Sequence, residues 1–241
     1  MGQESALVAE YLTNGFVLRD LLDGAAVRSL AAVADTFATS ASSMVSSSGD
    51  FNIEADGGGY LGQDGGSAGY RGLLRKVSNA ASHSPVVREY SERPSMMAFV
   101  SELMQGAPCH LVHSVMWFKP PKVGSAKPPH QDAPYLKGDP NQYLTIWIAI
   151  DDSTSDNGCL EVVAGSHQYG PVLHEGQEAR VSADRWATET SRPVPLSAGR
   201  AIAFHPYLLH ASKPNRSSKS RRALTLRYVI DDSKAAIRDD C

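Results

Sequence analysis

The spacing of hydrophobic residues changes once along the chain, near residue 109. Before it, apolar side chains recur every three or four residues in "SALVAEYL", "AAVRSLAAVADTFA" and "SPVVREYSERPSMMAFVSELMQG", which predicts helices. The pattern is interrupted at Asn14-Gly15 and Asp23-Gly24, and the "FVLRDLL" between these breaks fits a short strand equally well. Gly106 is expected to end the last helical stretch.

After residue 109 the period is two. Alternating segments such as "HLVHSVMWFK", "QYLTIWIAID", "CLEVVAGSH", "RAIAFHPYLLH" and "ALTLRYVI" are separated by Pro, Gly, Asn and Asp clusters, which predicts short strands. Helices followed by such strands indicate an α+β protein, most economically a jelly-roll barrel with the N-terminal helices packed on one sheet. We expect one domain over residues 1–241, with a helical part at 1–110 and a jelly-roll core at 110–232.

Residues 40–70 interrupt both patterns, because they are rich in Ser and Gly and contain few large apolar residues. A long segment of this kind inside a compact domain is typical of a lid, a binding loop or disorder. A linker between domains is the alternative. The helical part before the segment is short for a free-standing domain, which favours a lid.

The alternation also sorts side chains onto strand faces. The aliphatic faces are expected under the helices, and the mixed faces are expected to line the barrel interior. A single solvated sheet face would give the same alternation. The aliphatic set is Leu144, Ile146, Ile148 and Ile150, and the mixed sets include Thr145 and Trp147 on one strand and Arg221, Ala223, Thr225 and Arg227 on the last.

Composition narrows the possible partners. A net charge of −3 with 20% charged residues gives no basic surface for nucleic acid or an anionic membrane. No apolar run approaches the roughly 20 residues of a membrane span, and the first residues lack a signal-peptide pattern. The three cysteines, Cys109, Cys159 and Cys241, are too far apart for a paired zinc site or a disulfide framework. A cytoplasmic protein with a small-molecule substrate is expected.

The segment "PPHQDAPY" contains the strongest candidate chemistry. His130 and Asp132 lie two residues apart, so both can point to one place from a strand. His205 and His210 in "GRAIAFHPYLLHASKPN" are candidates for a third ligand. Two imidazoles and one carboxylate form the facial triad of non-haem Fe(II) oxygenases. An H-x-D pair alone is weak evidence, because it occurs by chance in many chains.

Arg221 strengthens the case because it follows His210 by 11 residues (221 − 210) across the polar turn "ASKPNRSSKS". If the turn is a hairpin, Arg221 faces the same cavity from the neighbouring strand. Its guanidinium can then hold the far carboxylate of a keto acid through two parallel hydrogen bonds. The alternative is a solvated turn residue beside Arg222.

Residues 113–230 resemble the phytanoyl-CoA dioxygenase family of Fe(II)- and 2-oxoglutarate-dependent oxygenases, which are built on a double-stranded β-helix. The resemblance lies in "HQD", "IWIAIDDSTSDNGCLEVVAGSH" and "GRAIAFHPYLLHASKPNRSSKSRRALTLRYV", in that order. It implies Fe(II) as the metal, with 2-oxoglutarate and O2 as cosubstrates. By this resemblance the metal ligands are His130, Asp132 and His210, and the 2-oxoglutarate residues are Arg221, Trp147 and, more loosely, Lys76. Thr145, on the strand face of Trp147, is expected to donate its hydroxyl to the cosubstrate.

His210 is preferred to His205 as the ligand because only His210 has the arginine at the family spacing. His205 and His167 are then structural residues. Halogenases related to this family replace the carboxylate with a small residue. This chain keeps Asp132, so halogenation is not expected.

The resemblance implies oxidation of an unactivated C–H bond, by hydroxylation or oxidative cyclisation, with release of succinate and CO2. A small natural product is the leading hypothesis for the substrate. Alternatives are an acyl-CoA or carrier-bound acid as substrate, a metal-dependent hydrolase or isomerase on a cupin-like barrel, and a metal-free binding module. The expected substrate-lining residues are His113, Trp117, Tyr135 and Tyr70, although ordinary packing also explains such side chains.

Overall fold

The computed structural model describes residues 5–54, 72–176 and 180–231. Tyr70 and residues 55–70 of the expected lid therefore lie outside the described residues. Of that segment, the structure places residues 40 and 41 at the end of a helix and residues 51–53 in a strand.

The N-terminal part folds as its hydrophobic spacing predicts. Gly15 ends the first helix with a φ of +77°, a conformation that favours glycine. The Asp23 side chain caps the second helix by accepting a hydrogen bond from the Ala26 N–H. Between these two breaks the chain is a strand, which settles the ambiguity of "FVLRDLL". The elements are α1 (Ala6–Asn14), β1 (Phe16–Asp20) and α2 (Gly24–Ala41).

The next helical stretch is divided into short helices. Arg93 precedes Pro94 and has a ψ of 150°, because proline disfavours the helical conformation of the residue before it. The expected long helix is therefore broken at this point, and Gly106 follows the last segment. The helices are α3 (Ala80–His83), α4 (Pro85–Glu92) and α5 (Pro94–Leu103).

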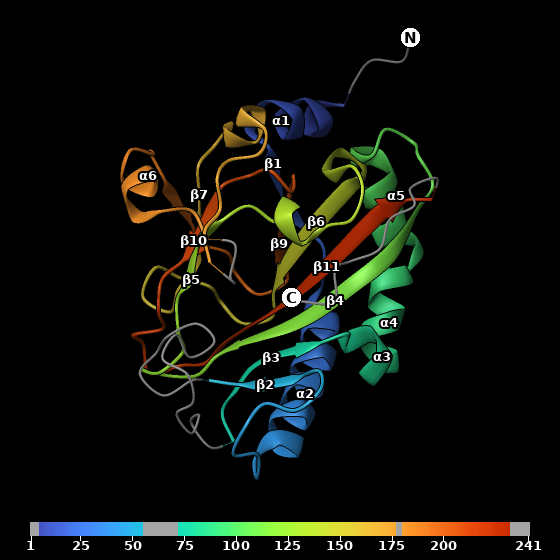
Figure 1. Ribbon diagram of the computed structural model, residues 1–241. Helices are drawn as coiled ribbons and strands as arrows, with labels where there is room; N and C mark the ends of the chain where they lie inside the picture. The colour runs from blue at the N-terminus through green and yellow to red at the C-terminus, as the bar shows by residue number, and fades with distance from the viewer. Residues whose placement is uncertain (1–4, 55–71, 177–179, 232–241) are drawn as a thin grey trace.

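Two antiparallel sheets form the rest of the described structure (Figure 1). The larger sheet has the strand order β1-β9-β6-β11-β4-β3-β2 and the smaller one the order β5-β10-β7-β8. Their strands are β2 (Phe51–Ile53), β3 (Leu74–Ser78), β4 (Cys109–Lys119), β5 (Lys127–His130), β6 (Tyr143–Ala149), β7 (Leu160–Val162), β8 (Arg192–Val194), β9 (Arg200–Phe204), β10 (His210–Ser212) and β11 (Arg221–Ile230). Between them lie α6 (Ala183–Ala187) and the 3-10 turns η1 (Ala133–Tyr135), η2 (Pro140–Gln142) and η3 (Ser166–Tyr169).

The two faces of the larger sheet have different neighbours. Helices α2, α4 and α5 cover one face, while β5, β10 and β7 lie on the other side (Figure 1). The helix-covered core contains Leu144, Ile146 and Ile148 of β6 and the following Ile150, together with Leu30 and Met96 from the helices. A second apolar cluster, which includes Trp147, Val162 and Phe204, lies between the sheets. The predicted assignment of strand faces is confirmed, as is the α+β jelly-roll architecture.

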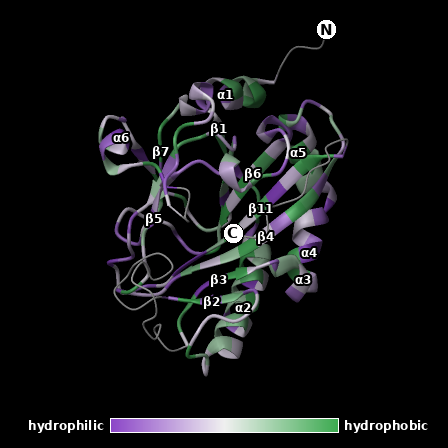
Figure 2. Ribbon diagram, in the orientation of Figure 1, coloured by the Kyte–Doolittle hydropathy of each residue, from purple (hydrophilic) through white to green (hydrophobic). Residues whose placement is uncertain are grey.

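Apolar residues are frequent along α2 and β6, whereas β11 alternates between polar and apolar residues (Figure 2). Among the helices of the described residues, none is long and apolar enough to cross a membrane.

Candidate metal centre and its cavity

The pairing of β5 with β10 places His130 directly opposite His210. The two imidazole ring centroids are 4.1 Å apart, and both side chains are buried. The register shifts by one residue between His210 and Ser212, as it does at a β-bulge. Bulges occur frequently next to active sites, where they change the direction of a side chain.

Asp132 follows β5, and the residue between it and His130 points the other way. The Gln131 side-chain amide donates to the carbonyls of Gly170 and Tyr207, and its oxygen accepts from the Val172 N–H. These bonds anchor Gln131 among surrounding loops. His130 and Asp132 consequently share the face that points inward, as the i and i+2 spacing predicts.

Three donor atoms meet where these segments converge. Asp132 Oδ1 lies 3.6 Å from His130 Nε2 and 3.9 Å from His210 Nε2. The three residues are all buried and form the single potential metal-binding group of this kind found in the described part of the chain. The structure thus brings together the three residues expected to form the triad, with His210 and not His205 as its second histidine.

Hydrogen bonds on the far side of each imidazole set its orientation. His130 Nδ1 lies 2.8 Å from the Pro128 carbonyl, and His210 Nδ1 lies 2.9 Å from the Leu208 carbonyl. A carbonyl can only accept, so each Nδ1 carries the hydrogen and each Nε2 keeps a lone pair directed toward Asp132. This is the tautomer that a metal-ligating histidine requires.

Burial also sets the charge of the site. Burial, followed by the nearness of His210, lowers the pKa of His130 to about 3, and burial lowers the pKa of His210 as well. Burial would raise the pKa of Asp132, but the Arg227 guanidinium and the two imidazoles outweigh it and hold that pKa well below its usual range. At neutral pH the group therefore presents two neutral imidazoles and one carboxylate, the protonation states that bind a divalent metal.

The outer oxygen of Asp132 has partners that the sequence did not identify. Arg227 Nη2 donates to Oδ2 at 2.8 Å, and Thr145 Oγ1 donates to the same oxygen at 3.0 Å. Thr145 has one hydroxyl hydrogen, so its expected donation to a cosubstrate competes with the bond to Asp132. Alternation along the strand predicts that Arg227 faces the cavity, but it does not predict this bond to Asp132.

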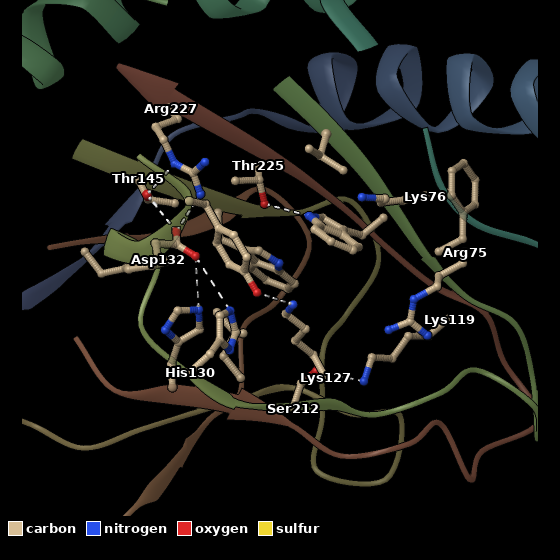
Figure 3. Close-up of a pocket in the computed structure, with 18 of the residues that line it drawn as sticks. Arg75, Lys76, Lys119, Lys127, His130, Asp132, Thr145, Ser212, Thr225 and Arg227 are labelled. Atoms are coloured by element: carbon tan, nitrogen blue, oxygen red, sulfur yellow. Dashed lines mark hydrogen bonds and ion pairs between the residues drawn. The ribbon is translucent and has the colours of Figure 1, made fainter. Parts of the chain in front are cut away.

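A cavity of about 120 Å³ opens beside the triad, between the two sheets (Figure 3). Besides His130, Asp132 and His210, it is lined by Thr145 and Trp147 of β6 and by His113 and Trp117 of β4. Six cationic side chains also line it: Arg75, Lys76, Lys119, Lys127, Arg221 and Arg227. Of the predicted interior-facing residues named for β6 and β11, all but Ala223 therefore line this cavity.

Arg221 is buried in this lining, with its guanidinium carbon 5.4 Å from the centre of the Trp147 ring. Its Nε has no hydrogen-bond partner among the described residues. Burial lowers the pKa of Arg221 to about 10, so the side chain remains charged at neutral pH. A buried, charged guanidinium with an unsatisfied donor is costly unless an anion completes the site.

Lys119 lies in the same region and is also buried. Its Nζ donates to Ser212 Oγ at 2.8 Å and to the Lys213 carbonyl. Burial first, and Arg221 second, lower the pKa of Lys119 well below its usual value. Gly158 permits this packing, since a Cβ there would lie 2.9 Å from Lys119 Nζ. Lys119, the last residue of β4, is therefore a buried cation in the cavity wall.

The remaining predicted residues of the cavity also have defined neighbours. Lys76 Nζ lies 5.8 Å from the centre of the Trp117 ring, and Trp117 Nε1 donates to Thr225 Oγ1 at 2.9 Å. Lys127 Nζ donates to the Tyr135 hydroxyl at 3.2 Å. Lys76, Trp117, Tyr135 and Thr225 line the cavity, where the sequence predicts them.

His205 and His167 lie outside the triad and the cavity lining. Their rings are 5.5 Å apart, and His167 Nε2 contacts the Leu12 carbonyl at 3.0 Å. The backbone N–H of His205 donates to the Gly15 carbonyl at 2.9 Å. His167 of η3 and His205, which follows β9, therefore both contact the segment at the end of α1.

A jelly-roll cavity with two imidazoles and one carboxylate defines the class of proteins with a 2-His-1-carboxylate site. Comparison with known families is more specific. The family model described as "Phytanoyl-CoA dioxygenase (PhyH)" matches residues 13–223, and the chain belongs to this family.

Relatives in other organisms agree with this assignment. "Phytanoyl-CoA dioxygenase domain-containing protein 1" of Mus musculus is 32% identical over 167 residues, which cover 65% of this chain and 57% of that protein. "Phytanoyl-CoA dioxygenase" of Arabidopsis thaliana is 31% identical over 173 residues, which cover 69% of this chain and 61% of that protein. The matched region thus spans about three fifths of each relative.

Solved structures show the same fold. The epimerase SnoN, determined with Fe3+, alpha ketoglutarate and nogalamycin RO, has a TM-score of 0.74 at 23% identity and covers 97% of this chain and 85% of its own. The carbocyclase SnoK from nogalamycin biosynthesis has a TM-score of 0.75 at 22% identity and covers 96% and 85%. AviO1 from Streptomyces viridochromogenes Tue57 has a TM-score of 0.74 at 23% identity and covers 96% of each chain.

Proposed function

We propose that this protein is an Fe(II)- and 2-oxoglutarate-dependent dioxygenase that oxidises an unactivated C–H bond of a small molecule and releases succinate and CO2. One observation carries the proposal. A single buried cavity is lined both by a His–Asp–His group and by an arginine whose buried Nε has no partner among the described residues. The first feature fits a divalent metal, and the second fits an anionic cosubstrate.

The residues present fit Fe(II). His130 Nε2, His210 Nε2 and Asp132 Oδ1 would hold the metal, because these three atoms converge while the other nitrogen of each imidazole is already hydrogen-bonded. Three protein ligands leave three positions of an octahedron open. When bound there with 2-oxoglutarate and O2, iron supplies the oxidising chemistry, and the protein positions the reactants and excludes water.

Arg221 would hold the far carboxylate of 2-oxoglutarate. It is buried and charged, and its orphaned Nε needs an acceptor. Ser212 would assist it, because the Lys119 ammonium donates to Ser212 Oγ and leaves the serine hydrogen free to turn toward the carboxylate. Trp147 would form a wall of this subsite, since its ring lies against the guanidinium. Lys76 lines the cavity and remains a candidate contact.

The substrate would enter beside His113, Trp117 and Tyr135, which line the same cavity. A natural product is favoured as the substrate, because two structures with the same fold belong to nogalamycin biosynthesis. The family relatives favour an acyl-CoA as the second candidate. We also propose that residues 1–241 act as one functional unit. A reducing cytoplasm is the proposed location, and the free thiols of Cys109 and Cys159 would persist there.

Anaerobic visible spectroscopy tests the site directly. The purified protein is titrated with Fe(II), then with 2-oxoglutarate, beside Asp132→Ala and Arg221→Met. We expect a charge-transfer band that appears only after both additions. The band should be absent in Asp132→Ala, and Arg221→Met should need far more 2-oxoglutarate to produce it. Tight metal binding by the wild-type protein with no such band would overturn the oxygenase assignment in favour of a hydrolase or isomerase.

The substrate class is tested separately by succinate release under air. Free small molecules and their coenzyme A thioesters are compared at equal concentrations with the Fe(II)-loaded enzyme. Stimulation by free compounds alone supports the natural-product proposal, whereas stimulation only by thioesters overturns it in favour of an acyl-CoA substrate.

A further inference from the structure

The two oxygens of the Asp132 carboxylate have different surroundings. Oδ1 faces the Nε2 atoms of His130 and His210 at 3.6 and 3.9 Å. Oδ2 accepts hydrogen bonds from Arg227 at 2.8 Å and from Thr145 at 3.0 Å (Figure 3). One oxygen therefore points to the candidate metal position, while the other is held by the protein.

The two donors come from the opposite sheet. Asp132 follows β5 of the smaller sheet, whereas Thr145 and Arg227 are directly opposite each other on β6 and β11 of the larger one. Arg227 Nε also lies 3.4 Å from Thr145 Oγ1, so the two side chains support each other. The contact crosses the barrel interior and fixes the carboxylate relative to both sheets.

The arrangement is buried and charge-assisted. The side chains of Asp132 and Arg227 are 8% and 7% exposed, so water screens the pair only weakly. Hydrogen bonds between ionised partners are short and strong, and removing one partner of a buried pair is costly. Arg227 is thus a fixed part of the site and unsuited to a mobile role in binding substrate.

We propose that Arg227 is a positioning residue that, together with Thr145, reserves Asp132 Oδ1 as the only carboxylate atom available to the metal. The inference rests on the proposed function, because it concerns how the same site binds its metal. Carboxylates can bind a divalent metal through one oxygen or through both. Because two donors occupy Oδ2, binding of the metal through both carboxylate oxygens is disfavoured. Binding through both oxygens would fill one of the metal's coordination positions that the cosubstrates need.

Removal of the guanidinium should change both the affinity and the geometry of the metal site. Outer partners of metal ligands typically contribute 10- to 100-fold to metal affinity. Arg227→Met is therefore expected to weaken Co(II) binding by about 10- to 100-fold and to alter the Co(II) spectrum. Arg227→Lys can donate one hydrogen bond but has no planar fork, so it should restore part of both properties. Thr145→Val should have the smaller effect, because Arg227 remains.

Co(II) titration of the metal-free protein tests this inference, since the visible absorption of Co(II) reports its coordination number. Wild type, Arg227→Met, Arg227→Lys and Thr145→Val are compared, with Arg222→Met as the control. Arg222 lies on the same strand but points to the helix side of the sheet, where it pairs with Asp35 of α2 and with Asp151. The expected result is a changed spectrum and weaker affinity in Arg227→Met, partial recovery in Arg227→Lys and wild-type behaviour in Arg222→Met.

The outcomes distinguish positioning from a purely structural role. A structural role would lower the melting temperature of the metal-free variants while the folded protein kept the wild-type Co(II) spectrum, and that result would overturn the inference. Should Arg227→Met fail to fold, an unchanged spectrum in both Arg227→Lys and Thr145→Val would also overturn it. Failure of the proposed function is recognised differently, because the wild-type protein would then give no iron–oxoglutarate band even if Co(II) bound as expected.

Discussion

His130 and His210 face each other across strands β5 and β10, with their ring centroids 4.1 Å apart. Two residues separated by 80 positions (210 − 130) become neighbours through one pairing register. A register slip of one residue would turn one of these side chains to the other face of the sheet. The bonds of the Gln131 side chain to Gly170, Tyr207 and Val172 anchor the residue next to His130.

The two histidines of the "HPYLLH" segment should respond differently to substitution. His210→Ala removes a donor atom and should weaken Fe(II) binding by more than about 100-fold, because even partners of metal ligands are worth 10- to 100-fold. His205→Ala should keep metal binding, since His205 contacts His167 and Tyr207 and not the triad. Isothermal titration with Fe(II) under nitrogen measures both. Equal losses in the two variants would contradict the assignment of His210.

Gln131 should be needed for the fold of the site although it points away from the metal. It is completely buried, and its side chain satisfies two carbonyls and one N–H. Gln131→Met leaves these groups unpaired and should lower the free energy of unfolding by about 2–4 kcal/mol. Urea denaturation measures the change.

Gln168→Met is the matched control for Gln131. Its side chain is exposed and makes one long bond, 3.4 Å, to the Thr13 carbonyl. Its substitution should change the free energy of unfolding by less than about 0.5 kcal/mol. A similar loss in both variants would indicate that the bonds of Gln131 have no special role.

His113 should make the protein sensitive to acid. Burial, then the charges of Arg227 and Lys76, lowers the pKa of His113 to about 3 from a usual value of 6.5. The unfolded chain therefore binds this proton first. Stability from this group is complete above about pH 6.5 and is lost as the pH falls toward 3. Between pH 7 and pH 5 the loss should be about 2 kcal/mol, at 1.36 kcal/mol per pH unit.

Urea denaturation of wild type and His113→Leu at pH 7 and pH 5 isolates this contribution. Relative to His113→Leu, the wild-type protein should have a free energy of unfolding about 2 kcal/mol lower at pH 5 than at pH 7. His110, which lies on the same strand and is half-exposed, provides the control. His110→Leu should lose as much unfolding free energy between pH 7 and pH 5 as the wild-type protein, because His113 is still present. An equal pH dependence in wild type and His113→Leu would show that His113 is not buried as described.

Local patterns explain why much of the fold could be predicted. Alternation along β6 and β11 assigns Ile146 and Ile148 to the helix side and Thr145 and Arg221 to the cavity, because side chains on a strand alternate whatever the strand pairs with. The spacing of His130 and Asp132 worked for the same reason. Strands β2, β7, β8 and β10 have three residues each, which is too short for a period to be recognised without further signals.

Contacts between distant segments could not be predicted in this way. Arg227 and Asp132 are 95 residues apart, and Lys119 and Ser212 are 93 apart. Which pairs meet depends on strand register and on how the two sheets face each other, neither of which alternation determines. The sequence could place Thr145 and Arg227 on an inward face, but it could not show that both donate to one carboxylate oxygen.

Arg221 and Arg222 offer a test in which stability and binding change in opposite directions. Arg221 is buried with an unsatisfied Nε, so Arg221→Met should maintain or raise the melting temperature of the protein without ligands. Arg222 makes two hydrogen bonds to the Asp151 carboxylate and one to Asp35. Arg222→Met should therefore lower the free energy of unfolding by about 1 kcal/mol.

Without ligands, Arg221→Met should be more stable than Arg222→Met. Addition of 2-oxoglutarate with Mn(II), an inert substitute for iron, should make Arg221→Met the less stable of the two variants. Wild type and Arg222→Met should both gain about 2.7 kcal/mol of stability when 2-oxoglutarate is present at 100 times its dissociation constant. Arg221→Met should gain almost nothing from 2-oxoglutarate at that concentration, while keeping the stabilisation by Mn(II) alone. Differential scanning fluorimetry with and without each ligand measures these shifts. Full stabilisation of Arg221→Met by 2-oxoglutarate would place the carboxylate subsite elsewhere in the cavity, with Lys76 the next residue to substitute because it lines the same cavity.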